Sequence, residues 1–147
     1  MTENINRQIR LAGRPVGLPK ESDWELVEEA IPTPGPGQLV LRNHFISVDP
    51  AMRGWMNDRK SYVPALPLGS TMRALTVGEV VASKHPTFSV GDPVAGLGGV
   101  QMYSLSEGSD LQKIDLSLAP FPVWLDTLGI AGLTAYCGLL KIGEPQA

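Results

Sequence analysis

The chain lacks paired cysteines, long apolar runs and a basic surface, and each absence excludes a class of protein. Its one cysteine, Cys137, excludes an internal disulfide framework and a cysteine-rich structural zinc site. No apolar run reaches the roughly 18 residues that cross a bilayer, and the first residues contain no apolar segment of a signal peptide. We therefore expect a cytoplasmic protein without a membrane partner.

Charge is also scarce. Charged residues make up 18% of the chain, against about 25% in an average domain. The 12 lysines and arginines are outnumbered by 15 acidic residues, which leaves a formal net charge of −3. Nucleic acids and acidic membranes bind clustered basic residues, so we expect neither as a partner.

Glycine and proline, in contrast, are abundant. There are 16 glycines and 13 prolines among 147 residues, about a fifth of the chain, against roughly 12% on average. The excess has no collagen-like period, and a hydrophobic content of 43% is enough to form a core. This composition favours a turn-rich β domain over a disordered tail.

Short strand-like segments separated by turns fill the first 120 residues. The expected strands cover residues 7–11, 24–28, 38–47, 76–82, 93–95 and 100–105. Alternation in 38–47 predicts that Leu39, Leu41 and Phe45 share one face of their strand. Strands of this length at this spacing predict a mainly β domain, either a barrel or a sandwich.

The last part of the chain has a different pattern. Apolar residues recur at helical spacing over 128–140, and Gly143 and Pro145 are placed to end the helix. We expect Tyr136 to be buried in its packing face and Cys137 to be a small buried residue, not a nucleophile. A single apolar helix at the end of a β domain needs a partner, so the chain reads as cut short.

The most specific stretch is RNHFISVDPAMRG at 42–54. A strand is expected to end at Asp49, which caps the following turn, and Pro50 opens a helix. Polar corners of this kind often carry a binding site. An ordinary strand-to-helix corner is the alternative.

Motifs for self-contained catalysis are missing. The glycines at 96–99 do not form a phosphate-binding loop, because Gln101 stands where the third glycine belongs and a strand follows. No Ser, His or Cys lies in a known nucleophile motif. The residues that ligate metals are scattered without ligand spacing: His44, Asp49, Glu79, His85 and Cys137.

Several segments together resemble the zinc-independent medium-chain dehydrogenase/reductases, in the alkenal/one (double-bond) reductase branch. In chain order they are PGPGQLVLR at 34–42, SVDPAMRG at 47–54, VGEVV at 77–81, GDPV at 91–94 and GLTAY at 132–136. The resemblance implies a GroES-like, partly open β-barrel with short helices over residues 1–125. Residues 126–147 would then form a linker helix leading to a Rossmann domain that this chain lacks.

The resemblance also implies the chemistry. Related enzymes add hydride from NADP(H), bound mainly by the missing domain, to the C=C bond of an enone or enal, or to a quinone. The ligands of the zinc-dependent relatives are absent, because ISVD at 46–49 and GST at 69–71 stand in their places. Family members are often dimers through the cofactor domain, so the resemblance makes a homodimer one possible assembly and leaves the oligomeric state open.

Site residues follow from the same resemblance. Ile130 and Thr134 match residues that approach the nicotinamide. Ala51, Gly99 and Val100 match positions that contact the substrate, and Ala51 replaces a tyrosine that is frequent in the family.

Asp49 and Arg53 match the family motif, with a structural role as the alternative. Because none of the site residues is a self-sufficient acid, base or nucleophile, we expect the isolated chain to be inactive. A stand-alone GroES-like binding or assembly module without catalysis is the alternative function.

Overall fold

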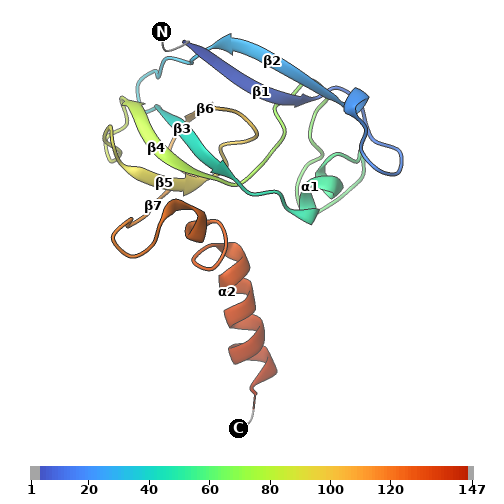
Figure 1. The fold of residues 1–147 in the computed structure, drawn as a ribbon, viewed down its shortest axis with the longest axis vertical. Coiled ribbons are helices and arrows are strands. Elements are labelled where there is room, and N and C mark those ends of the chain that lie inside the picture. Colours follow the sequence, from blue (N-terminus) through green and yellow to red (C-terminus); the bar gives the residue numbers. More distant parts are fainter. Residues whose placement is uncertain (1–3, 146–147) are drawn as a thin grey trace.

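The computed structural model describes residues 4–145, and strands dominate it (Figure 1). The strands are β1 (Ile5–Leu11), β2 (Trp24–Ala30), β3 (Leu39–Ile46), β4 (Thr76–Ser83), β5 (Pro93–Gly96), β6 (Tyr103–Ser106) and β7 (Gln112–Lys113). A two-stranded antiparallel ribbon contains β1 and β2, and the other strands form one antiparallel sheet in the order β6-β3-β4-β5-β7. The prediction of a mainly β fold is confirmed.

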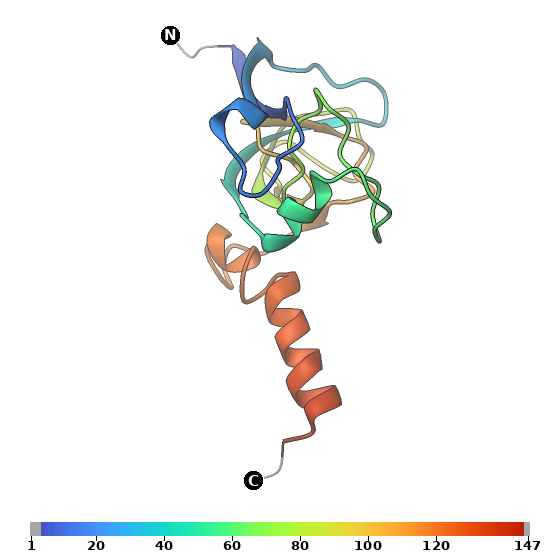
Figure 2. The same cartoon turned by 90° about the vertical axis from the view of Figure 1, so that its right-hand side faces the viewer.

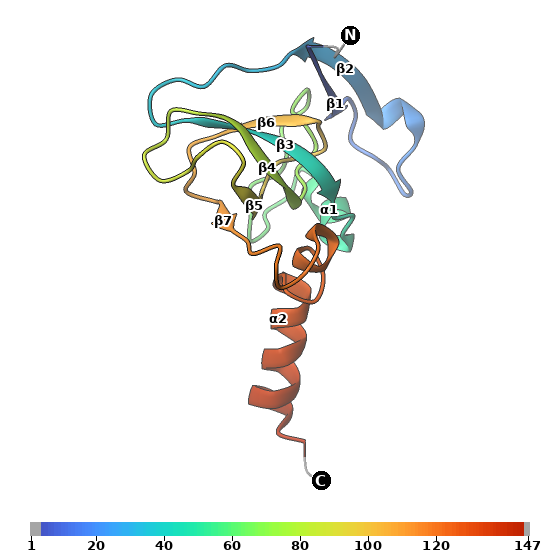
Figure 3. The same cartoon turned by 60° about the vertical axis from the view of Figure 1, so that its left-hand side comes forward.

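The ribbon lies across from β3 at one end of the molecule (Figure 3). Isolated bridges link β1 to segments far along the chain, pairing Gln8 with Gln101 and Arg10 with Thr71. The ribbon is thus attached to the rest of the body through the loop before β4 and the loop between β5 and β6.

Two apolar clusters form the core. One lies within the larger sheet and contains Leu39, Leu41, Val80, Phe88 and Val94. The other lies beneath the ribbon and contains Leu11, Met52, Met56, Leu66, Met72 and Ala74, with Trp24 and Trp55 packed against it. The second cluster therefore joins β1 to the helix that follows β3.

The predicted face of β3 is correct in its first half and wrong in its second. Leu39 and Leu41 are buried as expected, but Phe45 is 45% exposed. The pairing of β3 with β4 shifts between Val40 and Leu41 and again between Asn43 and Phe45. An irregular residue in a strand reverses the faces beyond it, so strict alternation does not extend to Phe45.

Helices are short and lie outside the sheets. They are α1 (Pro50–Trp55), α2 (Ile130–Tyr136) and the wider helical turns of η3 (Cys137–Gly143), with the 3₁₀ turns η1 (Glu21–Asp23) and η2 (Phe121–Trp124). None of these described helices is long and apolar enough to cross a membrane. The expected helix over 128–140 is present, shifted by two or three residues.

The helix formed by α2 and η3 projects away from the body, at the end opposite the ribbon (Figures 1 and 2). Tyr136 is 54% exposed and Cys137 is also exposed, so the prediction that both are buried is wrong. The left-handed residue after the helix is Glu144, with φ 42°, and not Gly143. Nothing in the described chain covers the apolar side of this helix.

Candidate functional site

The corner at Asp49 opens a helix as the sequence predicts, although β3 ends earlier than expected, at Ile46. Asp49 is the residue before α1 and Pro50 is the first helical residue. The Met52 amide donates to the Asp49 carbonyl at 3.0 Å, and the Asp49 amide lies 3.3 Å from Met52 Sδ. Ala51 is half-buried beside Met52, whose side chain enters the core beneath the ribbon.

Arg53 holds a neighbouring loop in place. Its Nη2 donates to the carbonyl of Gly17 at 2.8 Å and to that of Pro15 at 3.1 Å. Its Nη1 donates to Asn57 Oδ1 at 2.8 Å. These contacts satisfy the guanidinium with groups of the body itself, which is the geometry of a structural residue.

The segment Gly98–Val100 is held by backbone bonds to two other segments, the loop before β4 and strand β1. The Gly99 amide donates to the Ala74 carbonyl at 3.1 Å, and the Val100 amide donates to the Met72 carbonyl at 2.8 Å. The Val100 carbonyl accepts from the Ile9 amide at 2.9 Å. Because these partners belong to different parts of the body, the position of Val100 is set by the tertiary structure.

Glycine is required at both positions before Val100. Gly99 has φ +74°, a backbone conformation that side chains disfavour. A Cβ atom on Gly98 would collide with the Thr76 hydroxyl and the Asn43 amide. The close packing of Gly98 brings this segment against β3 and β4.

A buried amide network supports the same segment, and the sequence analysis missed it. Asn6 is 3% exposed, and its Nδ2 donates to Gln101 Oε1 at 3.1 Å. Gln101 Nε2 in turn donates to the Gly98 carbonyl at 2.8 Å. The only sequence signal is a pair of amides, Asn6 and Gln8, on one face of β1.

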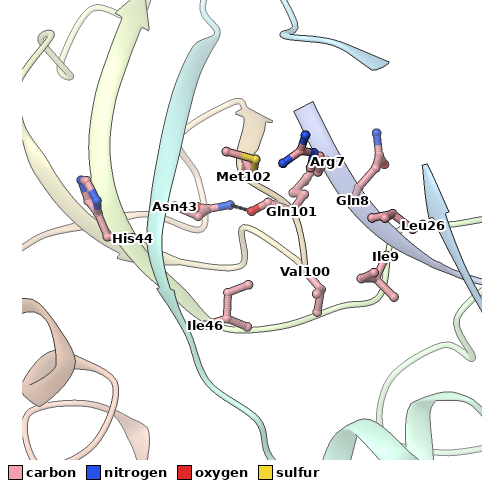
Figure 4. A pocket seen from close by; sticks show the side chains of 10 residues that line it. All are labelled: Arg7, Gln8, Ile9, Leu26, Asn43, His44, Ile46, Val100, Gln101 and Met102. Atoms are coloured by element: carbon pink, nitrogen blue, oxygen red, sulfur yellow. Dashed lines mark hydrogen bonds between the residues drawn. The ribbon is translucent and has the colours of Figure 1, made fainter. Parts of the chain in front are cut away.

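A shallow hollow of about 220 Å³ lies between the ribbon and β3 (Figure 4). Figure 4 shows Ile46 and Val100 pointing into it, whereas His44 points away towards β4. Leu26 and Met102 contribute further apolar surface to its lining. Val100 also lines an adjacent apolar hollow on the side of α1.

Ile130 lines a different hollow, of about 490 Å³, between the larger sheet and the C-terminal segment. Its walls come from β4, β5, η2 and α2, and they are mostly apolar, with Asp110 and Gln112 as the acidic and amide groups. Thr134 lies one turn after Ile130, and its hydroxyl donates to the Ile130 carbonyl at 2.6 Å. Both side chains are exposed.

The expected site residues therefore fall into two groups. Ala51, Gly99 and Val100 lie on the body near α1, and Ile130 and Thr134 lie on the projecting helix. No hollow described above is lined by members of both groups. Within residues 4–145, no three histidine, cysteine, aspartate or glutamate side chains gather as a metal site.

The shifted pKa values belong to turn residues and not to these hollows. Hydrogen bonds from Lys113 and the Ser89 amide hold the pKa of Asp92 below its usual value. The hydroxyl and amide of Ser117 lower the pKa of Asp115. Both carboxylates stabilise loops and are not placed for acid–base chemistry at the hollows.

Residues 7–114 match a family described as the N-terminal domain of oxidoreductases. This chain belongs to that family. It is 45% identical over 142 residues to an NADPH-dependent curcumin reductase of Escherichia coli, covering 96% of this chain and 41% of that protein. It is also 34% identical to an NADP(+)-dependent 2-alkenal reductase of Nicotiana tabacum, covering 99% of this chain and 44% of the relative.

A solved relative supports the same membership. The structure of CurA in complex with NADPH from Vibrio vulnificus has a TM-score of 0.85 and 42% identity, covering 95% of this chain and 42% of that one. The present oxidoreductase domain thus spans about two fifths of the length of the relatives it matches.

Proposed function

We propose that this chain is the substrate-side domain of an NADP(H)-dependent oxidoreductase that adds hydride to an activated C=C bond without zinc. The expected substrates are α,β-unsaturated ketones and aldehydes, or quinones. The observation that carries the proposal is the 45% identity with an NADPH-dependent curcumin reductase along 96% of this chain. The apolar surroundings of Val100 support it, because an apolar wall suits a conjugated carbonyl compound.

The residues near α1 contribute by positioning the substrate and not by acid–base or nucleophilic chemistry. Ala51, Gly99 and Val100 carry no acid, base or nucleophile, so their contribution is to hold the substrate and exclude water. The backbone bonds that fix Val100 between Ile9 and Met72 make this wall rigid before substrate binds.

The residues of α2 fit a cofactor contact. Ile130 and Thr134 are exposed, and Ile130 lines an apolar hollow. The Thr134 hydroxyl donates to the Ile130 carbonyl, which leaves its oxygen as an acceptor. NADPH supplies the hydride when bound.

The cofactor phosphates are expected to bind outside this chain. The sequence contains no Gly-x-Gly-x-x-Gly loop, so we propose that a longer protein supplies that site and that the 147-residue chain alone is inactive. A homodimer in the cytoplasm belongs to the same proposal, and neither nucleic acid nor a membrane does.

Two measurements test the proposal. Calorimetry compares NADPH binding by the 147-residue chain with binding by a form extended to the length of the relatives. NADPH oxidation by the extended form is then followed with a panel of enones, enals and quinones. We expect binding and turnover by the extended form alone.

Other outcomes are equally informative. Absence of turnover across the whole panel would contradict the proposed reaction. Tight NADPH binding by the 147-residue chain would contradict the proposal that the cofactor phosphates bind outside this chain. If neither form binds NADPH, the chain is better described as a binding or assembly module.

A further inference from the structure

An apolar hollow beneath the ribbon is left unfilled by the side chains around it. It has a volume of about 320 Å³ and is lined by Ile9, Trp24, Met52, Met72 and Val100. All of these side chains are apolar, and they come from β1, β2, α1, the loop before β4 and the loop between β5 and β6. Figure 4 places Ile9 and Val100 on the side of the neighbouring hollow that faces α1.

The size and lining of this hollow suit an organic ligand. The hollow is shallow and open to solvent, so an occupant would lie against its apolar wall and lose part of its own apolar surface from water. Methionine side chains adapt their shape to an occupant, and Met52 and Met72 lie on its walls. Tryptophan at position 24 adds a flat surface on which an aromatic ring can stack.

The walls are held independently of any ligand. The Val100 amide donates to the Met72 carbonyl at 2.8 Å, and the Met72 amide donates to the Ile9 carbonyl at 2.8 Å. The Ile9 amide completes the set by donating to the Val100 carbonyl at 2.9 Å. Three lining residues are therefore fixed through their backbones, which lowers the entropic cost of binding.

The hollow also adjoins the proposed substrate wall. Val100 directly follows Gly99, and Met52 directly follows Ala51 in α1. Gly99 is itself buried, so Val100 is the residue that the proposed substrate wall and this hollow share, and a substrate that lies against Val100 has the hollow within reach of its next groups.

We propose that this hollow binds the non-reacting apolar arm of the substrate, an aryl ring or a short alkyl chain. The inference rests on the proposed function for its role, but the occupancy of the hollow is tested separately. The full-length reductase should prefer carbonyl compounds with a longer apolar arm. Each added methylene is expected to raise kcat/KM by about threefold to fourfold until the hollow is filled.

Methionine methyl signals report on the occupancy without any turnover. The 147-residue chain is labelled with ¹³C at the methionine methyl groups and titrated with toluene and with 4-phenylbutan-2-one, a ketone without a reducible C=C bond. We expect the signals of Met52 and Met72 to shift and to show contacts to the ring protons. Met56, which does not line the hollow, is the internal control.

The result that overturns the inference is equally plain. If Met52 and Met72 do not shift up to the solubility limit of both probes, or if Met56 and Met102 shift equally, the hollow is not a site. Failure of the proposed function gives a different result. If the full-length enzyme shows no turnover but the signals of Met52 and Met72 still shift, the proposed reaction is contradicted and ligand binding in the hollow is supported.

Matched variants test the role in the full-length enzyme. Val100→Phe fills the hollow, and Val90→Phe adds the same ring at an exposed position outside it. We expect V100F to abolish the chain-length dependence of kcat/KM and V90F to retain it. If V100F does not fold, Val100→Leu with half the added bulk replaces it. Unchanged chain-length dependence in a folded variant at position 100 would overturn the inference.

Discussion

The β body and the C-terminal helix both contain many apolar side chains but bury them differently. Leu39 and Val77 in the body are 0% exposed, whereas Leu133 and Leu139 in the helix are 62% and 60% exposed. The body buries its apolar side chains between strands that come from distant parts of the chain. The helix has the same kind of side chains, but only its first turn lies near the sheet and no described element packs against the rest, so helical periodicity alone does not produce a core.

This difference has a consequence for function. Contiguous exposed apolar surface marks a place where a protein or another domain binds. In the proposed full-length reductase, the exposed side of α2 and η3 is where a cofactor domain would pack. The body, in contrast, buries its own apolar side chains and fixes the position of Val100 through its own backbone bonds.

The largest expected effect comes from one substitution made in both regions. Leu39→Ala removes a fully buried side chain and should lower the free energy of unfolding by about 3 kcal/mol. Leu139→Ala removes a side chain that is 60% exposed and should change it by less than about 0.5 kcal/mol. Urea unfolding of the chain measures both values. Equal losses would show that the helix is buried in solution.

A pair of glycines should give effects of opposite sign. Gly98→Ala drives a Cβ into the Thr76 hydroxyl and the Asn43 amide, and should destabilise the body by about 2 kcal/mol. Gly138→Ala meets open space in a helical segment and should stabilise the chain by about 0.5 kcal/mol. Thermal unfolding compares the variants. A stabilising Gly98→Ala would contradict the close packing described for that loop.

The smallest expected effect is pH-dependent and belongs to the body. Lys113 Nζ lies 2.6 Å from Asp92 Oδ2, and the pKa of Asp92 is lowered. A lowered pKa in the folded state means that the stabilisation is present above the unfolded pKa and is lost as the pH falls through the folded pKa.

Asp92→Asn should therefore cost about 0.5 kcal/mol at neutral pH, and nothing once the carboxyl of the wild type is protonated. Urea unfolding at neutral and acidic pH measures this difference, with Glu107→Gln as an exposed control. A difference that persists unchanged in acid would show that the ion pair is not its cause.

Strands and the corner at Asp49 were predictable because their signals are local. Alternation, turn residues and the Asp49-Pro50 pair lie within a few positions of the elements that they specify. The short strand β7 was not predicted, and the other observed strands differ from the predicted ones mainly at their ends. Within β3, the predicted face is wrong at Phe45. A shift in the pairing with β4 decides its exposure, and no residue near Phe45 signals that shift.

The hydrogen bonds that hold the candidate site were not predictable, because they join residues that are far apart in the sequence. Asn6 and Gln101 are separated by 95 positions, and only the approach of β1 to the loop before β6 brings their amides together. The hollow beneath the ribbon likewise joins residues from segments far apart in the chain. Local periodicity carries no information about such contacts.

The sequence by itself determined the strands, the helix-opening corner, the terminal helix and the family to which the chain belongs. Only the tertiary structure decided which apolar faces are covered, where Val100 lies and how Gly98 is enclosed. The physical reason is that periodicity assigns residues to a face, while burial depends on the distant segment that packs against that face.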